Sequence, residues 1–134
     1  MKIFVDTSAF IAIVNPKDSH HTEAITRRKC IKEEKIQCYT SNLVLYETLT
    51  WLAIKLGPDA AVQLGEGILQ ESPHLNMLYL DREDELASLK VLKKYHQIPL
   101  SFADASSLHF IHKYQLDQVF GFDEHFTEVN LILF

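Results

Sequence analysis

Four acidic residues interrupt otherwise apolar segments of the chain, and their positions are the first indication of chemistry. They are Asp6 in IFVDTSAF, Glu47 in LVLYETLTW, Asp104 in LSFADASSL and Asp123 in VFGFDEHF. Carboxylates are seldom fully buried unless they are paired or bind a metal ion. Because each of the four follows a predicted strand or lies near the start of a predicted helix, we expect them to converge in one anionic pocket.

The chemistry of such a pocket follows from its charge. Two unit charges 4 Å apart repel by about 4 kcal/mol at an effective dielectric constant of 20, so converging carboxylates take up protons or bind a cation. Carboxylate and water oxygens are the ligands that Mg²⁺ and Mn²⁺ prefer, and the sequence has no His-rich or Cys-rich spacing typical of Zn²⁺ sites. Bound divalent ions activate water and stabilise both oxygens of a displacement at phosphorus. The pattern therefore favours hydrolysis of phosphodiester bonds.

Three of the acids also have purely structural interpretations. Asp6 stands at a predicted strand-to-helix junction, where an Asp commonly caps the helix. Ser101 and Asp104 form an S-x-x-D pattern that resembles a capping box. Asp123 is placed to start a helical turn. Capping and function remain open alternatives for each of these residues.

Glu47 is harder to explain by capping. On a helix its neighbours at i−4, i−3, i+4 and i+7 are apolar, namely Leu43, Val44, Trp51 and Ile54. We therefore expect Glu47 to lie on the apolar side of its helix, where a leucine would be usual. The structural alternatives are a buried ion pair or a position at the edge of that side.

Strands and helices are predicted to alternate along the whole chain. This order indicates a mostly parallel sheet with helices on both faces, and in such folds ligands bind beyond the carboxyl ends of the strands. Asp6 and Asp123 directly follow predicted strands. The predicted strands are residues 2–5, 37–40, 76–80, 119–122 and 131–134, and the predicted helices are residues 7–14, 18–35, 42–56, 59–71, 82–96 and 102–114. On the helix over residues 18–35, Ala24, Ile25 and Ile31 are predicted to face inward.

Bulk properties restrict the class of protein. A chain of 134 residues fits a single domain, residues 1–134, and the net charge of −5 argues against a classical basic DNA-binding module. Cys30 and Cys38 are too few for a disulfide framework, which favours a reducing compartment. No segment approaches the roughly 18 apolar residues of a membrane span, and residues 1–14 lack a secretory cleavage pattern. We expect a soluble, cytoplasmic protein that does not enter membranes.

Other chemically active side chains have ordinary surface interpretations. His109 and His112 lie one helical turn apart, and we interpret them as a solvated face. Tyr46 and Tyr114 are candidates for stacking on exposed bases, whereas Trp51 is expected in the core. Two basic clusters are interpreted as solvated helix faces in preference to a phosphate track: Arg27, Arg28, Lys29, Lys32 and Lys35, and Lys90, Lys93 and Lys94.

Taken together, four motifs in order resemble those of a known nuclease family. The segments VDTSAFIA, NLVLYETL, LSFADASSL and GFDEHF are similar to motifs of PIN-domain ribonucleases, and the chain most resembles the VapC-type toxins of prokaryotic toxin–antitoxin pairs. The resemblance spans essentially the whole chain. It implies a three-layer α/β/α sandwich and an endoribonuclease that depends on Mg²⁺ or Mn²⁺.

The resemblance also implies roles for individual residues. Asp6, Glu47, Asp104 and Asp123 match the family's acidic cluster, whose members hold metal directly or through water and so position the attacking water. Ser8 and Ser101 match small hydroxyl positions that orient an acid or contact phosphate. The implied partners are an RNA substrate, a second copy in a homodimer and a short antitoxin protein that inhibits the site.

The chain departs from the family pattern at one position. Two residues before Asp123, where relatives often carry a hydroxyl or amide side chain, this sequence has Gly121. A polar contact near the fourth acid is therefore expected to be missing.

Several other classes of protein compete with the nuclease. A haloacid-dehalogenase-type phosphatase needs a second Asp two residues after the first, and that position is Ser8. A phosphorylation receiver domain needs paired acids and a later lysine, a combination that the sequence lacks. DNA nucleases of related fold carry insertions for which this chain leaves little room. A catalytically silent PIN-like module that binds RNA or protein, and a PIN nuclease of RNA processing or turnover, remain open.

Overall fold

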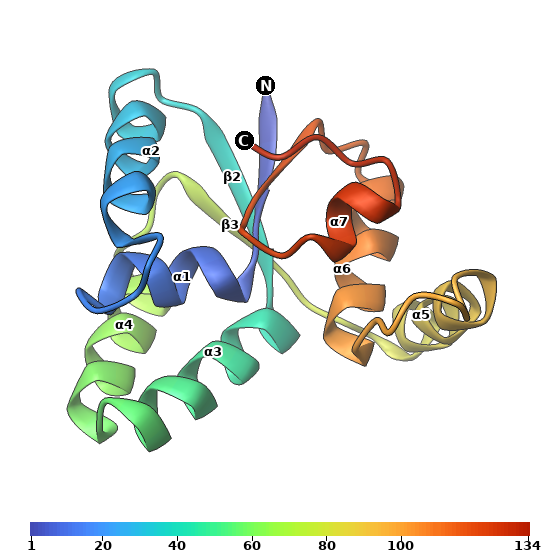
Figure 1. Ribbon diagram of the computed structural model, residues 1–134, viewed down its shortest axis with the longest axis horizontal. Helices are drawn as coiled ribbons and strands as arrows, with labels where there is room; N and C mark the ends of the chain where they lie inside the picture. Colours follow the sequence, from blue (N-terminus) through green and yellow to red (C-terminus); the bar gives the residue numbers. More distant parts are fainter.

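A four-stranded parallel sheet forms the centre of the molecule (Figure 1). The computed structural model describes residues 1–134, apart from the side chain of Glu71. Because all the paired strands run in the same direction, their carboxyl ends meet at one edge of the sheet. The strand order is β3-β2-β1-β4, with β1 at Lys2–Val5, β2 at Gln37–Ser41, β3 at Leu75–Leu78 and β4 at Gln118–Phe120.

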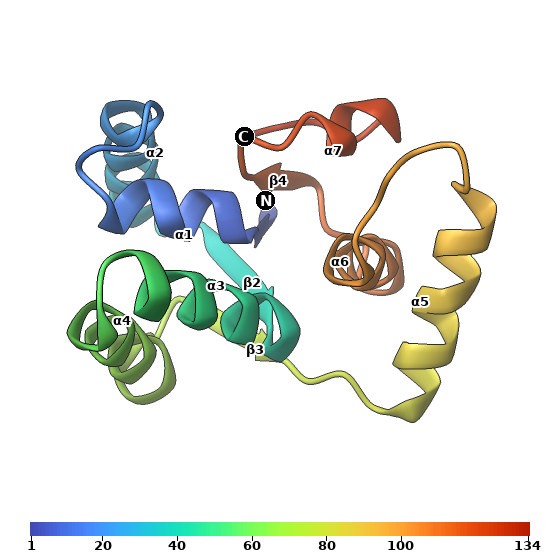
Figure 2. The same cartoon turned by 60° about the horizontal axis from the view of Figure 1, so that its bottom comes forward.

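Seven described helices cover the sheet and make the predicted three-layer arrangement (Figures 1 and 2). Helices α1 to α4 gather on one side of the strands, and α5 to α7 on the other. Helix α3 packs against both α1 and α6, so it joins the two groups. None of the helices in the described residues is long and apolar enough to span a bilayer. The helices are α1 (Thr7–Val14), α2 (His21–Glu33), α3 (Asn42–Lys55), α4 (Pro58–Glu71), α5 (Arg82–Lys94), α6 (Phe102–Lys113) and α7 (His125–Glu128).

Much of the core lies around β1 and the neighbouring edge strand β4. Phe4 of β1 and Phe120 of β4 are almost completely buried, and Phe110 of α6 and Phe126 of α7 pack into the same cluster. Burying one such aromatic side chain contributes about 1.5–3 kcal/mol. Since Phe4 lies one residue before the carboxyl end of β1 and Phe120 is the last residue of β4, this packing fixes the backbone that leads into the acidic segments.

Three structural expectations from the sequence were wrong. Residues 131–134 do not form a full strand, because only Leu133 bridges Val119 and the turn at Asn130, with φ 62°, leaves few residues for pairing. Helix α2 begins at His21 and not at residue 18, because the Asp18 carboxylate accepts the backbone N–H of residue 20 in a preceding turn. Ile25 was expected to face inward, but it is 40% exposed.

Candidate active site

Asp6 lies at the carboxyl end of β1 and caps helix α1. Its side-chain Oδ2 accepts hydrogen bonds from the backbone N–H of Ser8 at 3.3 Å and from the Ser8 hydroxyl at 3.0 Å. Its own backbone N–H donates to the carbonyl of Phe120 at 3.0 Å, which ties the residue to β4. The capping interpretation is thus confirmed, and the residue is also only 5% exposed.

Burial changes the protonation of Asp6. Desolvation, together with a smaller effect from the negative charge of Asp104, outweighs the hydrogen bonds from Ser8 and raises the pKa of its carboxyl to about 7. At neutral pH the carboxyl is therefore partly protonated. A nearby cation would favour the ionised form, so Asp6 is able to respond to the arrival of positive charge.

Ser8 connects the start of α1 to the loop that follows β4. Its hydroxyl oxygen accepts the backbone N–H of Phe122 at 2.9 Å while its hydroxyl hydrogen points to Asp6. A Cβ atom added at Gly121 would lie 3.1 Å from both Ser8 Oγ and Asp6 Cβ. The absence of a side chain at Gly121 therefore leaves room for Asp6 and Ser8, whereas the sequence had indicated a missing polar contact near Asp123.

Asp104 occupies the third position of helix α6 and forms the predicted capping box. Its Oδ2 accepts the backbone N–H of Ser101 at 3.0 Å, and Ser101 Oγ accepts the backbone N–H of Asp104 at the same distance. Its side chain is only 13% exposed. The capping box uses one carboxylate oxygen of Asp104 and so fixes the orientation of the side chain. Ser101 itself is exposed.

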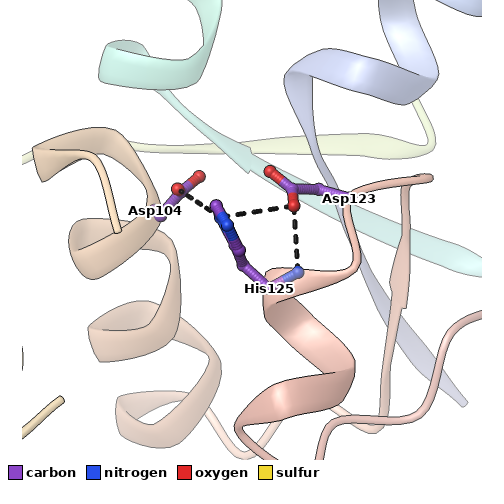
Figure 3. Close-up of side chains that lie close together, drawn as sticks. All are labelled: Asp104, Asp123 and His125. Atoms are coloured by element: carbon purple, nitrogen blue, oxygen red, sulfur yellow. Dashed lines mark hydrogen bonds and ion pairs between the residues drawn. The ribbon is translucent and has the colours of Figure 1, made fainter. Parts of the chain in front are cut away.

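Asp123 follows β4 and approaches Asp104 through a third residue, His125 (Figure 3). Asp123 Oδ1 accepts the backbone N–H of His125 at 2.9 Å, which begins the turn into α7. The His125 imidazole Nδ1 lies 3.4 Å from Asp123 Oδ1 and 3.7 Å from Asp104 Oδ2. One ligand atom from each of the three residues lies within 4.8 Å of the others, as a metal site requires.

Glu47 occupies a different environment from the other three acids. It is exposed in the second turn of α3, so the expectation that it lies on the apolar side of the helix was wrong. Ile54, on the same side, is 74% exposed, and the buried side of α3 is formed by Val44, Leu45, Thr48 and Leu52. No hydrogen bond or ion pair among the described side chains joins Glu47 to another acid.

The structure therefore brings together two of the four predicted acids, Asp104 and Asp123, with a histidine, and Asp6 lies close enough to Asp104 for the charge of that residue to raise its pKa. Carboxylates placed in this way suit a hard divalent cation, whose charge would offset their repulsion. The imidazole Nδ1 of His125 is buried and has no hydrogen-bond partner among the described residues. His125 was not singled out from the sequence, although the Asp-x-His spacing in GFDEHF was a signal that could have identified it.

His109 was expected on a solvated face but is an ion-pair partner. Its Nε2 lies 2.7 Å from Oδ1 of the buried Asp84, and Lys113 Nζ lies 2.9 Å from the same oxygen. Burial alone would raise the pKa of Asp84, but hydrogen bonds from His109 and Lys113 hold it well below its ordinary value. This cluster joins α5 to α6 and stands apart from the acidic site. His112 is exposed as expected.

The basic cluster on α2 is not simply a solvated face, because Arg27 contacts other side chains. Arg27 pairs with Glu23, and its guanidinium carbon lies 5.1 Å from the centre of the Phe122 ring. Since Phe122 stands next to Asp123, this arginine supports the site loop. The second cluster, on α5, is exposed as expected. Tyr46 and Tyr114 are also exposed, and Trp51 is half-buried.

Comparison with known families decides what this arrangement represents. The model of the PIN domain matches residues 3–131. The chain belongs to the PIN-domain family. The match covers all four predicted acids, Asp6, Glu47, Asp104 and Asp123. The prediction of a PIN-type α/β/α fold is confirmed.

The chain is also similar to named VapC proteins. It is 34% identical over 109 residues to a VapC ribonuclease of Archaeoglobus fulgidus, covering 80% of this chain and 68% of that protein. It is 28% identical over 130 residues to the 23S rRNA-specific endonuclease VapC20 of Mycobacterium tuberculosis, covering 97% and 95% of the two chains. The predicted resemblance to VapC-type PIN ribonucleases is therefore confirmed.

Solved structures support the same relationship. The crystal structure of Mycobacterium tuberculosis VapC20, described as a sarcin–ricin loop cleaving toxin, superposes with a TM-score of 0.85 at 29% identity, over 97% of this chain and 96% of that chain. VapBC2 from Rickettsia felis, bound to a DNA fragment from its promoter, matches with a TM-score of 0.73 at 13% identity, over 100% and 98%. The second likeness extends to the fold alone.

Proposed function

We propose that this PIN-domain protein is a metal-dependent endoribonuclease of the VapC type, which hydrolyses phosphodiester bonds in RNA. The observation that carries the proposal is the approach of Asp104, Asp123 and His125 to one another, with Asp6 close enough to Asp104 to feel its charge. Similarity to VapC ribonucleases along nearly the whole chain supports the same activity. Residues 1–134 would form one nuclease domain that acts in the cytoplasm.

The donor set favours Mg²⁺ or Mn²⁺ as the cofactor. Asp6, Asp104 and Asp123 would hold the ion, with Glu47 contributing from α3 as the fourth acid of the family pattern. When bound, a divalent ion supplies an activated water and offsets negative charge beside the phosphate. Because the chain carries a net charge of −5, this local neutralisation is needed before an RNA backbone can approach the site.

The chain's own residues prepare the site for this reaction. Ser8 orients the Asp6 carboxylate and holds the loop after β4 in place through the N–H of Phe122. The capping box with Ser101 orients Asp104. Because its pKa is raised to about 7, Asp6 is partly protonated at neutral pH, and nearby positive charge would favour its ionised form. Both serines are thus better suited to orienting acids than to contacting phosphate.

The partners follow from the same family relationship. We propose that the protein is the toxin of a toxin–antitoxin pair, that it forms a homodimer and that a short antitoxin protein inhibits it. Structures of toxin–antitoxin complexes share its fold, among them one from Klebsiella pneumoniae. Because VapC20 is named as specific for 23S rRNA, 23S rRNA is the first substrate to test.

The proposal is tested by incubating the purified protein with total RNA and with isolated 23S rRNA. Mn²⁺ or Mg²⁺ is supplied in one arm and EDTA in the other, and cut sites are mapped by primer extension. We expect discrete metal-dependent cuts, which Asp104→Asn abolishes and Asp59→Asn, a matched change at an exposed acid, preserves. Tight RNA binding without cleavage at millimolar Mn²⁺ would instead identify a silent binding module.

A further inference from the structure

The imidazole Nδ1 of His125 is a buried polar atom without a hydrogen-bond partner among the described residues. A normal N–H···O bond spans 2.7–3.2 Å, and the nearest carboxylate oxygens lie 3.4 Å away on Asp123 and 3.7 Å away on Asp104. Buried polar groups in native proteins are nearly always satisfied, so a missing partner calls for an explanation.

We infer that His125 is a metal ligand, and that its Nδ1 completes the site with oxygens from Asp104 and Asp123. The inference rests on the proposed function and deepens it, because it names a residue outside the four acids and narrows the choice of ion. The three side chains come from two separate elements, helix α6 and the segment that enters α7, and they point toward one another (Figure 3).

The spacing of the three donor atoms supports shared coordination. Adjacent ligands around an octahedral ion with bonds of about 2.1 Å lie about 3 Å apart. The distances from Nδ1 to the two carboxylates exceed this by about half an ångström, a gap that small rotations of the partly buried side chains close. Both distances lie within ion-pair range but are longer than a normal N–H···O hydrogen bond.

The backbone holds His125 ready for this role. The N–H of His125 donates to Asp123 Oδ1 at 2.9 Å, so the two residues cannot move independently. The next residue, Phe126, is 1% exposed in the core and anchors the turn. This backbone contact keeps the two residues close together, so that only small side-chain rotations separate them from coordination distance.

A nitrogen ligand has a consequence for ion selectivity. Mg²⁺ retains oxygen ligands and water, whereas imidazole binds first-row transition ions well. The site is therefore expected to bind Mn²⁺ more tightly than Mg²⁺, and Co²⁺ more tightly than Mn²⁺. The four-carboxylate pattern by itself leaves the choice between Mg²⁺ and Mn²⁺ open.

The direct test is electron spin-echo envelope modulation spectroscopy of the full-length protein loaded with Mn²⁺. We expect ¹⁴N modulations in the wild type, their replacement by ¹⁵N signals when histidine is ¹⁵N-labelled, and their loss in His125→Gln. His112→Gln, a change at an exposed histidine, is the matched control and should retain them. Calorimetry should show Mn²⁺ affinity falling about tenfold or more in His125→Gln, and Mg²⁺ affinity changing less than about threefold.

The outcomes separate this inference from the proposed function. Tight Mn²⁺ binding without ¹⁴N modulations in the wild type, or with modulations that survive in His125→Gln, would overturn the role of His125 and leave the carboxylate site standing. Absence of any Mn²⁺ binding would overturn both. The labelled wild-type spectrum keeps the test decisive if His125→Gln does not fold.

Discussion

Asp6 combines two roles that look like alternatives in the sequence. It caps helix α1 through hydrogen bonds from Ser8, and it is also buried beside Asp104 with a pKa raised to about 7. The cap accounts for the orientation of the carboxylate, but a cap at the surface would not be desolvated in this way. A structural role therefore does not argue against a functional one at this residue.

Because the pKa of Asp6 is raised, we predict that the free energy of unfolding depends on pH. In EDTA the native state holds this proton up to about pH 7, whereas the unfolded chain releases it near pH 3.8, so the free energy of unfolding falls as pH rises between these values. Asp6→Asn keeps a capping side chain but removes the ionisation. We expect the variant to gain about 1–3 kcal/mol at pH 8 relative to the wild type, and little at pH 4.

Urea denaturation in EDTA from pH 4 to pH 8 measures this difference, with Asp59→Asn as the control. Equal pH dependence in wild type and Asp6→Asn would show that burial does not perturb the carboxyl. A clear drop in melting temperature for Asp6→Asn would mean that capping alone explains the residue.

Gly121 provides a test of the close packing around Asp6. A Cβ atom there meets Asp6 Cβ and Ser8 Oγ at 3.1 Å, so Gly121→Ala forces both to shift. We expect a loss of about 1–2 kcal/mol in stability and a larger proportional loss of RNA cleavage. Gly67→Ala is the control, because nothing lies within 4 Å of its added Cβ and it stands in helix α4. Unchanged cleavage in Gly121→Ala would contradict the assigned geometry.

Glu47 is the acid whose assignment depends most on family resemblance. It is exposed and has no described ion-pair partner, so Glu47→Gln should leave the melting temperature within about 1 °C of the wild type. If Glu47 contributes to the metal site, the same variant should lose RNA cleavage at least about tenfold. Parallel assays with Glu66→Gln, an exposed acid of α4, separate this loss from a general effect of charge. Full activity in Glu47→Gln would remove it from the site.

At the scale of elements, the strands and helices that are marked by local sequence patterns were predicted well. Residues 2–5 and 7–14 have the predicted bounds, because a β-branched apolar run and an Asp-Thr-Ser cap are both local patterns. The capping box of Ser101 and Asp104 was likewise readable from four residues. Residues 131–134 were misassigned because strand pairing depends on a partner far away in the chain, and only one bridge forms there.

The site itself shows the same division between local and non-local information. Asp6 and Asp123 were placed correctly because parallel strands end at one edge of the sheet. The prediction for Glu47 was wrong because α3 buries a different side, which includes Thr48. The Thr48 hydroxyl donates a hydrogen bond to the carbonyl of Val44, so this polar side chain can be buried in the core. The approach of His125 to Asp104 depends on how α7 packs against α6, which no local pattern encodes.

The contact between α5 and α6 leads to a prediction at this scale. Asp84 is buried and accepts hydrogen bonds from His109 and Lys113, and its pKa lies below the ordinary value. A depressed pKa means that the stabilisation is present above about pH 4 and is lost as pH falls further. We expect Asp84→Asn to cost about 1–3 kcal/mol at pH 7, and less near pH 2.

Chemical denaturation at the two pH values measures this effect, with Glu83→Gln as the control on the exposed side of the same helix turn. The cleavage rate per folded molecule should change little, because this cluster stands apart from the acidic site. An equal loss of stability at both pH values would show that packing, and not charge, explains the contribution of Asp84.

At the scale of the whole molecule, the fold brings acidic residues that are far apart in the sequence close together in space. Asp6 and Asp123 follow the neighbouring strands β1 and β4, and α6 brings Asp104 close to Asp123 and within electrostatic reach of Asp6. The aromatic core behind these segments holds them in place. Carboxylates assembled in this way repel one another, so the metal-free protein gives up stability for function. A bound divalent ion removes the repulsion and should stabilise the folded state.

The most direct test of this account is a crystal structure of the protein grown with Mn²⁺, in which anomalous scattering locates the ion. We predict an anomalous peak between Asp6, Asp104 and Asp123, with carboxylate oxygens at about 2.2 Å. A well-ordered structure with no peak there, or with Mn²⁺ bound only elsewhere on the chain, would contradict the claim that these three acids form a metal-dependent nuclease site.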